Sequence, residues 1–219
     1  MRMKKIGVLL SGCGVRDGSE IHEATCTILA LVQQGAEPVF IAPDGSLNEV
    51  NHLTGEATGK QRNILVESAR IARGSVTAVS EVSADQLDGI IIPGGFGAAL
   101  NLSNFAVAGA AGIPDPSVAS LIQSIHTQNK PVGAICIAPA TLALILGPTI
   151  HPKVTIGTDS ATAAEITKTG AIHQDCSATD CVVDTDHKIV TTPAYMLATD
   201  IAQVFTGISK AVSELLKMC

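Results

Sequence analysis

The feature of the sequence that most constrains its fold is a stretch of twenty residues without any charge, from Pro131 to Ile150. By length and hydrophobicity alone, such a stretch would suit a membrane-spanning helix. Prolines and glycines interrupt it at positions 131, 133, 139, 147 and 148, and they divide it into a short strand and a short helix, each sized for a buried core. The sequence therefore predicts a strand followed by a helix inside a globular protein, and no membrane segment.

A cysteine lies between these two elements. The apolar run Val132 to Ile135 leads into Cys136, and the helical pattern begins almost at once, at Ala138. This order is typical of a nucleophile elbow, a tight strand-to-helix turn whose flanking positions, here Ala134 and Ala138, must be small. The N-terminal end of the helix should favour the thiolate form of the cysteine. A buried structural cysteine would fit the same local pattern, so both interpretations stay open at this point.

Composition narrows the class of protein. The chain has 219 residues, of which 46% are hydrophobic and 16% charged, as expected for a single globular domain over residues 1–219. A net charge of −6, one Tyr, no Trp and no cluster of basic residues argue against nucleic-acid binding. The apolar run near the N-terminus is too short for a signal peptide. The six cysteines contain no CxxC pair and are expected to be reduced, so we expect a cytoplasmic protein.

Strand and helix patterns alternate along the chain. Strands are predicted over 5–10, 37–42, 75–79, 88–93, 132–135 and 154–156, with a β-hairpin formed by 181–184 and 188–191. Helices are predicted over 19–34, capped by Asp17 or Ser19, and over 62–73, 116–128, 162–168 and 193–217, with a long polar loop over 43–59. Alternation of this kind predicts an α/β fold with a doubly wound, mostly parallel sheet and helices on both faces.

Two patterns that could indicate a bound group are weak. The glycine-rich segment GCGVRDG follows the first strand, but Asp17 stands at the third glycine position of a dinucleotide fingerprint and would repel a pyrophosphate. His173, Cys176 and Cys181 lie in one polar turn with a spacing that is not a standard zinc pattern. We therefore predict neither a cofactor nor a metal.

Ligands of doubly wound sheets bind beyond the carboxyl ends of the strands. Gly94 and Gly95 follow a buried strand, so their backbone N–H groups could face an anion at that edge. A thiolate nucleophile also needs a proton carrier beside it. Candidates from the first helix and the long loop are Glu20, His22, Glu23 and His52. The acids could equally serve only to complement the dipole of the helix.

The ordered motifs SGCGVRDGSEIHEA, NHLTGEA, PGGFGAALNLSNFA, ICIAPA, TIGTD and IVTTPAYMLA resemble the DJ-1/PfpI superfamily, and within it the ElbB/ES1 branch of isoprenoid-biosynthesis proteins, almost end to end. The resemblance implies a flavodoxin-like fold of the DJ-1/PfpI type. It gives Cys136 the place of the nucleophile and Glu23 that of the acid hydrogen-bonded to it. The N–H groups of Gly95 and Ile137 take the oxyanion-hole positions. Because relatives are usually dimers, it also implies a homodimer.

The sequence departs from the wider superfamily in one respect that matters for chemistry. The histidine that many members place after the cysteine would fall near Gly157, and no H-x-E pair occurs late in the chain. Glutaminase and protease activities, which need a triad, therefore lose support. The resemblance instead implies a slow, cofactor-independent glyoxalase, a lyase that converts glyoxal or methylglyoxal to glycolate or lactate. The alternative is a non-enzymatic redox-sensing or regulatory thiol protein.

Overall fold

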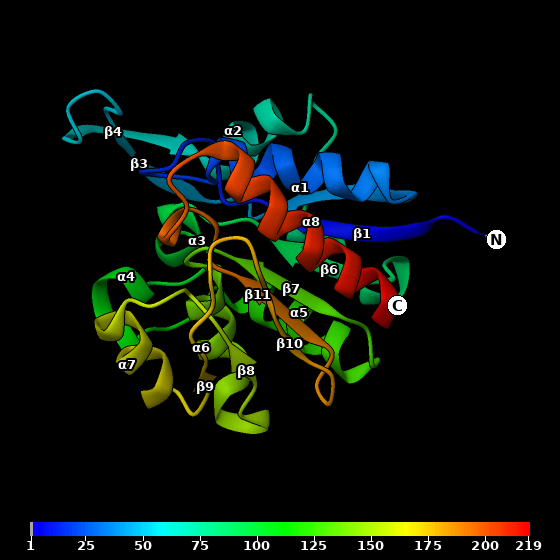
Figure 1. The fold of residues 1–219 in the computed structure, drawn as a ribbon. Coiled ribbons are helices and arrows are strands. Elements are labelled where there is room, and N and C mark those ends of the chain that lie inside the picture. Colours follow the sequence, from blue (N-terminus) through cyan, green and yellow to red (C-terminus); the bar gives the residue numbers. More distant parts are fainter. Residues whose placement is uncertain (1) are drawn as a thin grey trace.

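The computed structural model of the protein describes residues 2–219, and its centre is a seven-stranded sheet (Figure 1). In spatial order the strands are β10 (Val182–Asp184), β11 (Ile189–Thr192), β7 (Val132–Ile135), β6 (Gly89–Ile92), β1 (Lys4–Leu9), β2 (Ala36–Ala42) and β5 (Thr77–Ala78). All neighbouring pairs are parallel except β10 and β11, which form an antiparallel hairpin. The predicted α/β fold, its mostly parallel sheet and the late hairpin are confirmed.

Helices cover both faces of the sheet. On one face, α1 (Ile21–Gln33) and α8 (Ile201–Met218) pack against each other, and on the other lie α5 (Pro116–Thr127) and α6 (Ala138–Ile150) (Figure 1). Successive side chains of a strand point to opposite faces. Accordingly, Ile91 packs into the core beneath α1 and α8, while its neighbours Ile90 and Ile92 pack on the α5 and α6 side. Burial on both faces explains why these strands are apolar throughout.

The charge-free stretch is divided as its prolines and glycines predict. It forms β7 and then α6, which begins at Ala138 and ends at Ile150. Within residues 2–219, no helix combines the length and the apolar composition that crossing a membrane would require. A strand and helix of this size bury their apolar residues in the protein core instead.

Two predicted segments differ in the structure. The predicted loop 43–59 contains β3 (Ser46–Val50) and part of β4 (Ala57–Asn63), an antiparallel hairpin that projects from the body (Figure 1). Its strands carry mostly exposed side chains and therefore lack the apolar alternation by which half-buried strands are recognised. As a result, α2 (Ile64–Ile71) starts later than predicted, with Asn63 as its cap.

The limits of two helices were also wrong. Helix α1 is capped by Glu20, whose side chain accepts a hydrogen bond from the N–H of Glu23, and not by Asp17 or Ser19. The last helix does not start at Pro193: a short 3-10 turn over Ala194–Met196 comes first, and α8 begins after Asp200. Asp200 accepts a hydrogen bond from an N–H in the first turn, and such a cap outweighs the preference of proline for helix starts.

Smaller elements complete the fold. Three short helices, α3 (Phe96–Leu100), α4 (Phe105–Ala108) and α7 (Ser160–Lys168), lie near one another at the carboxyl edge of the sheet, on the left in Figure 1. Strands β8 (Lys153–Val154) and β9 (Ile172–His173) form a separate short parallel pair. The carboxyl ends of β6, β7 and β11 point toward the same edge because these three strands are parallel neighbours.

Candidate active site

Cys136 occupies the turn between β7 and α6 in a strained backbone conformation. Its φ angle is +62°, a value that costs a residue with a side chain roughly 1–2 kcal/mol. The turn is held from below by a hydrogen bond of 2.9 Å from the N–H of Cys136 to the carbonyl of Thr192. Ala134 and Ala138 are both fully buried beside it, as expected of the small residues that such an elbow requires.

Glu23 approaches the cysteine from the first turn of α1. Its side chain is fully buried, and its carboxyl shares a hydrogen bond with the thiol of Cys136. The two carboxyl oxygens also accept hydrogen bonds from backbone N–H groups, at 3.1 Å from Gly94 and at 3.2 Å from Tyr195. The carboxyl therefore joins α1 to the loops that follow β6 and β11.

Burial determines how this pair titrates. It raises the pKa of Glu23 to about 8, and the nearby negative charge of Glu20 adds to the rise, while the N–H groups of Tyr195 and Gly94 act against it. Burial also raises the pKa of Cys136 well above its usual range, and the Glu23 carboxyl raises it further. The N–H groups of Gly95 and Ile137 lower it by less. The predicted preference for the thiolate is thus wrong for the resting protein, because desolvation outweighs the helix terminus.

Glycines make room for this contact. A Cβ atom at Gly94 would lie 2.4 Å from the Cβ of Cys136 and 2.5 Å from a carboxyl oxygen of Glu23. At Gly95, where φ is +94°, a Cβ would lie 2.4 Å from the backbone of Glu20. Real side chains do not reach such distances. The N–H groups of Gly95 and Ile137 both hydrogen-bond to the sulfur, so both are near any oxyanion that forms on a carbon bound to it.

The other proton carriers that the sequence suggested lie in different places. Glu20 caps α1. The exposed His22 hydrogen-bonds through Nδ1 to the hydroxyl of Tyr195 at 2.8 Å, at the side-chain end of the residue whose backbone N–H binds Glu23. Sequence reasoning missed Tyr195, although it stands in the motif IVTTPAYMLA. Its role in holding Glu23 depends on a backbone N–H, which every residue except proline has, so its residue type carried no signal.

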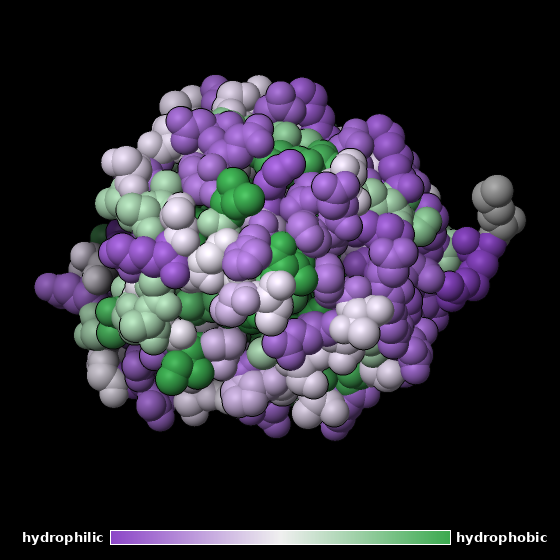
Figure 2. Space-filling model, turned by 90° about the horizontal axis from the view of Figure 1, so that it is seen from below, coloured by the Kyte–Doolittle hydropathy of each residue, from purple (hydrophilic) through white to green (hydrophobic). Residues whose placement is uncertain are grey.

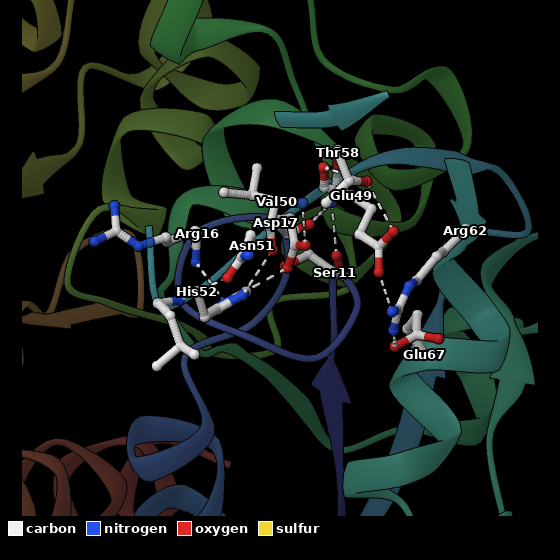
Figure 3. Close-up of polar contacts among 12 residues, drawn as sticks. Ser11, Arg16, Asp17, Glu49, Val50, Asn51, His52, Thr58, Arg62 and Glu67 are labelled. Atoms are coloured by element: carbon white, nitrogen blue, oxygen red, sulfur yellow. Dashed lines mark hydrogen bonds and ion pairs between the residues drawn. The ribbon is translucent and has the colours of Figure 1, made fainter. Parts of the chain in front are cut away.

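His52 belongs to a separate network on the projecting hairpin (Figure 3). Its Nε2 accepts a hydrogen bond from the N–H of Arg16 at 3.2 Å and lies 3.7 Å from the Asp17 carboxylate. Asp17 also accepts a hydrogen bond from the N–H of Val50 at 2.9 Å. The side chain at the third glycine position of the fingerprint therefore ties the glycine-rich loop to β3. The Asp17 carboxylate is thus already bound by groups of the chain itself, the N–H of Val50 and the ring of His52.

A second part of the same hairpin is linked to α2. The Arg62 guanidinium pairs with both Glu49 and Glu67, and the hydroxyl of Thr58 donates to Glu49 at 2.8 Å (Figure 3). The Arg62 side chain is 43% exposed, so solvent screens both ion pairs and each contributes little to stability. Together they connect the hairpin to α2.

The polar turn with His173, Cys176 and Cys181 shows no metal-binding arrangement. His173 Nε2 accepts a hydrogen bond from the N–H of Ile156 at 3.3 Å. Within residues 2–219, no group of three or more His, Cys, Asp or Glu side chains is placed to hold a metal ion.

The position of the superfamily histidine is closed to a side chain. Gly157 has a φ angle of +102°, and a Cβ there would lie 2.8 Å from the Leu197 side chain. Its N–H donates to the hydroxyl of Thr155 at 3.0 Å. Glu23 is therefore the titratable group in hydrogen-bond contact with Cys136, and this pair is the candidate catalytic centre.

Comparison with known proteins identifies the family to which the chain belongs. The model of the DJ-1/PfpI family matches residues 13–202. The chain belongs to the DJ-1/PfpI family. The ES1 protein homolog of rat is 39% identical over 225 residues, which cover 98% of this chain and 84% of the relative. The human glutamine amidotransferase-like class 1 domain-containing protein 3 is 39% identical over 98% of this chain and 83% of its own length.

Solved structures agree with this assignment. An isoprenoid biosynthesis protein with an amidotransferase-like domain from Ehrlichia chaffeensis has a TM-score of 0.93 and is 36% identical, over 98% of this chain and 99% of that one. Drosophila DJ-1beta, at 16% identity and a TM-score of 0.58, shares the fold. The resemblance to the DJ-1/PfpI superfamily and its ElbB/ES1 branch is confirmed.

The same comparison corrects the expected location. The names of the rat and human relatives, and of a zebrafish ES1 protein 28% identical over 233 residues, all say mitochondrial. The prediction of a cytoplasmic protein is therefore wrong. It rested on the lack of an apolar secretory signal, and mitochondrial proteins do not use such a signal.

Proposed function

We propose that this DJ-1/PfpI protein is a cofactor-independent glyoxalase that converts a small α-oxoaldehyde to the corresponding α-hydroxy acid. One observation supports the proposal above all: the sulfur of Cys136 is hydrogen-bonded at once to the Glu23 carboxyl and to the N–H groups of Gly95 and Ile137. A nucleophile, a proton carrier and two oxyanion donors are the groups that this isomerisation and hydrolysis need.

In the first step, the reactive form of the pair holds one proton between Cys136 and Glu23. The sulfur adds to the aldehyde carbon, a C–S bond forms, and the proton moves from the Glu23 carboxyl to the aldehyde oxygen. The product is a hemithioacetal. Glu23 is left as a carboxylate, which the N–H groups of Gly94 and Tyr195 stabilise.

In the second step, Glu23 removes the hydrogen of the former aldehyde carbon as a proton, and an enediol forms. Glu23 returns that proton to the neighbouring carbon, while the hydroxyl proton of the hemithioacetal moves to the neighbouring oxygen. The former aldehyde carbon is thereby oxidised to a thioester and its neighbour is reduced to an alcohol. Water then attacks the thioester, the C–S bond breaks, and the hydroxy acid leaves as the thiol of Cys136 reforms. The N–H groups of Gly95 and Ile137 stabilise the oxyanion of this hydrolysis.

The convergence of a proton carrier and two N–H groups on Cys136 supports an enzyme over the alternative of a redox-sensing thiol. Oxidation by peroxide needs only an accessible thiolate, whereas the proposed reaction uses the Glu23 carboxyl to move protons and both N–H groups to stabilise an oxyanion. The isoprenoid link that the sequence resemblance suggested is carried by the name of the Ehrlichia relative, and we include it as the setting of the proposed activity.

The test is the formation of glycolate from glyoxal by the purified protein, measured by NMR. We expect slow turnover that Cys136→Ala abolishes and that Glu23→Gln lowers strongly. Cys176→Ala, a change in a polar turn outside the site, is the matched control and should keep full activity. If the protein forms no glycolate above the uncatalysed reaction, or if Cys136→Ala forms as much as the unchanged protein, the proposed function is wrong.

A further inference from the structure

A cavity of about 350 Å³ opens directly beside the proposed oxyanion hole. It lies among α3, α4 and the N-terminal ends of α6 and α7. Its lining residues are Phe96, Ala99, Phe105, Ala106, Gly109, Ile137, Ala161, Thr162 and Glu165. Ile137 supplies one of the two N–H groups that face the sulfur, and Phe96 directly follows Gly95, which supplies the other. A substituent of a molecule bound at Cys136 would therefore lie next to this cavity, because the residues that follow Cys136 and Gly95 both line it.

The walls of the cavity are mainly apolar. Phe96, Phe105 and Ile137 supply large apolar surfaces, and three alanines leave the space between them open. Phe96 is 53% exposed, although phenylalanine is one of the residue types most often buried in proteins. Figure 2 shows the molecule from below. Apolar side chains (green) occur on its left, the side on which α4 and α7 lie in Figure 1.

The polar groups of the cavity do not favour an anion. Of the described residues that line it, none is a Lys, Arg or His. Glu165 accepts a hydrogen bond from the N–H of Ala110 at 2.9 Å and pairs with Lys168. The hydrogen bond from Lys168 lowers the pKa of Glu165, so its carboxylate stays ionised at the cavity wall. A carboxylate or phosphate on a ligand would meet a negative charge and no free cation.

We propose that this cavity binds the substituent of the substrate, and that the preferred substrates are α-oxoaldehydes with an uncharged, apolar group such as an aryl ring. The inference rests on the proposed function and adds the substrate class. Pockets for drug-sized ligands measure roughly 300–1,000 Å³. The observed cavity therefore exceeds what the two carbons of glyoxal need, and it suits a group of the size of a phenyl ring.

The first test compares phenylglyoxal with glyoxal as substrates. We expect kcat/KM to be at least about tenfold higher for phenylglyoxal, which is converted to mandelate, because a well-filled apolar pocket discriminates by about that much. Ala106→Trp fills the cavity from an exposed position and should lower the ratio of the two kcat/KM values about tenfold. Val107→Trp, next to it on α4 and outside the cavity lining, should leave the ratio unchanged and controls for modification of arginines by phenylglyoxal.

The second test does not depend on turnover. Phenacyl bromide and bromoacetone alkylate thiols and match the shapes of phenylglyoxal and methylglyoxal. Mass spectrometry gives the rate at which each labels Cys136, and each rate is divided by the rate with glutathione. We expect a corrected preference for phenacyl bromide of about tenfold, lost in Ala106→Trp and kept in Val107→Trp.

The two tests separate the possible failures. If neither aldehyde is converted but Cys136 still prefers phenacyl bromide, the proposed glyoxalase activity is wrong and the apolar pocket stands. If both aldehydes are converted with equal kcat/KM, or if the labelling preference equals that of glutathione, the inference about the pocket is overturned while the activity stands. An Ala106→Trp protein with an unchanged preference would overturn it as well.

Discussion

The buried Glu23 carboxyl should make the stability of the protein depend on pH in a way that Glu23→Gln removes. In the folded protein, Glu23 keeps its proton up to pH about 8, because burial raises its pKa from the ordinary value of 4.5. The unfolded chain releases the same proton near pH 4.5. Between these values the folded state binds more protons than the unfolded state, so the free energy of unfolding falls as pH rises.

The size of the effect follows from the two pKa values. Integrated between pH 5 and pH 7, the proton uptake of Glu23 lowers the free energy of unfolding by roughly 2–3 kcal/mol. Glutamine cannot titrate. It has nearly the same shape, and its amide facing the N–H groups of Gly94 and Tyr195 adds only a penalty that does not change with pH. The difference in stability between the unchanged protein and Glu23→Gln should therefore shift by roughly 2–3 kcal/mol in favour of the variant from pH 5 to pH 7.

Urea denaturation followed by far-UV circular dichroism measures this difference. The chain has no Trp and a single Tyr, so intrinsic fluorescence offers little signal. All other titrating groups are common to both proteins and cancel in the difference. Glu56→Gln, on the exposed tip of the hairpin, is the control. A difference between the unchanged protein and Glu23→Gln that stays constant from pH 5 to pH 7 would show that Glu23 is ionised in the folded state, and the proposed proton transfer would lose its basis.

Three further outcomes are expected. Hydroxy-acid formation should rise with pH up to about 8, where Glu23 loses its proton; a rate that falls over pH 6–8 would contradict the shared-proton form. Gly94→Ala should abolish activity and lower the melting temperature, because the new Cβ would lie 2.4 Å from that of Cys136. Gly45→Ala, whose Cβ meets nothing closer than 3.5 Å, should change neither. Leu215→Ala, in the fully buried core, should cost about 2–5 kcal/mol in urea denaturation, and a smaller loss would mean that this core can collapse around the gap.

The parts of the fold that could be predicted are those whose signal lies in neighbouring residues. The strand and helix around Cys136 were placed correctly because an apolar run, small flanking residues and a proline near the helix start all occur within a few positions. The β10–β11 hairpin likewise showed its alternation and its turn together. The β3–β4 hairpin did not, because its exposed strands have no buried face to impose a pattern.

The chemistry of the site was harder to predict because it depends on distant parts of the chain. A local argument from the N-terminal end of α6 predicted a lowered pKa for Cys136. That contribution is present, through the N–H of Ile137, but burial in the core and the carboxyl of Glu23 act in the opposite direction and are larger. The contact with Glu23 joins residues more than a hundred positions apart, and the burial also depends on other distant segments such as the loop at Gly94. No local pattern reports the strength of either.

The position of Glu23 is best explained by the proposed reaction rather than by stability. Burying a carboxyl that must keep its proton costs the folded protein stability at neutral pH. The backbone around it is strained as well, with positive φ angles at Cys136 and at Ala194, the residue before Tyr195. In return, two N–H groups and a thiol converge on one carboxyl that can exist with or without its proton. A residue that only held α1 to the sheet would not need to titrate near pH 8, whereas a group that takes a proton from carbon and returns it works best with a pKa near the pH of the reaction.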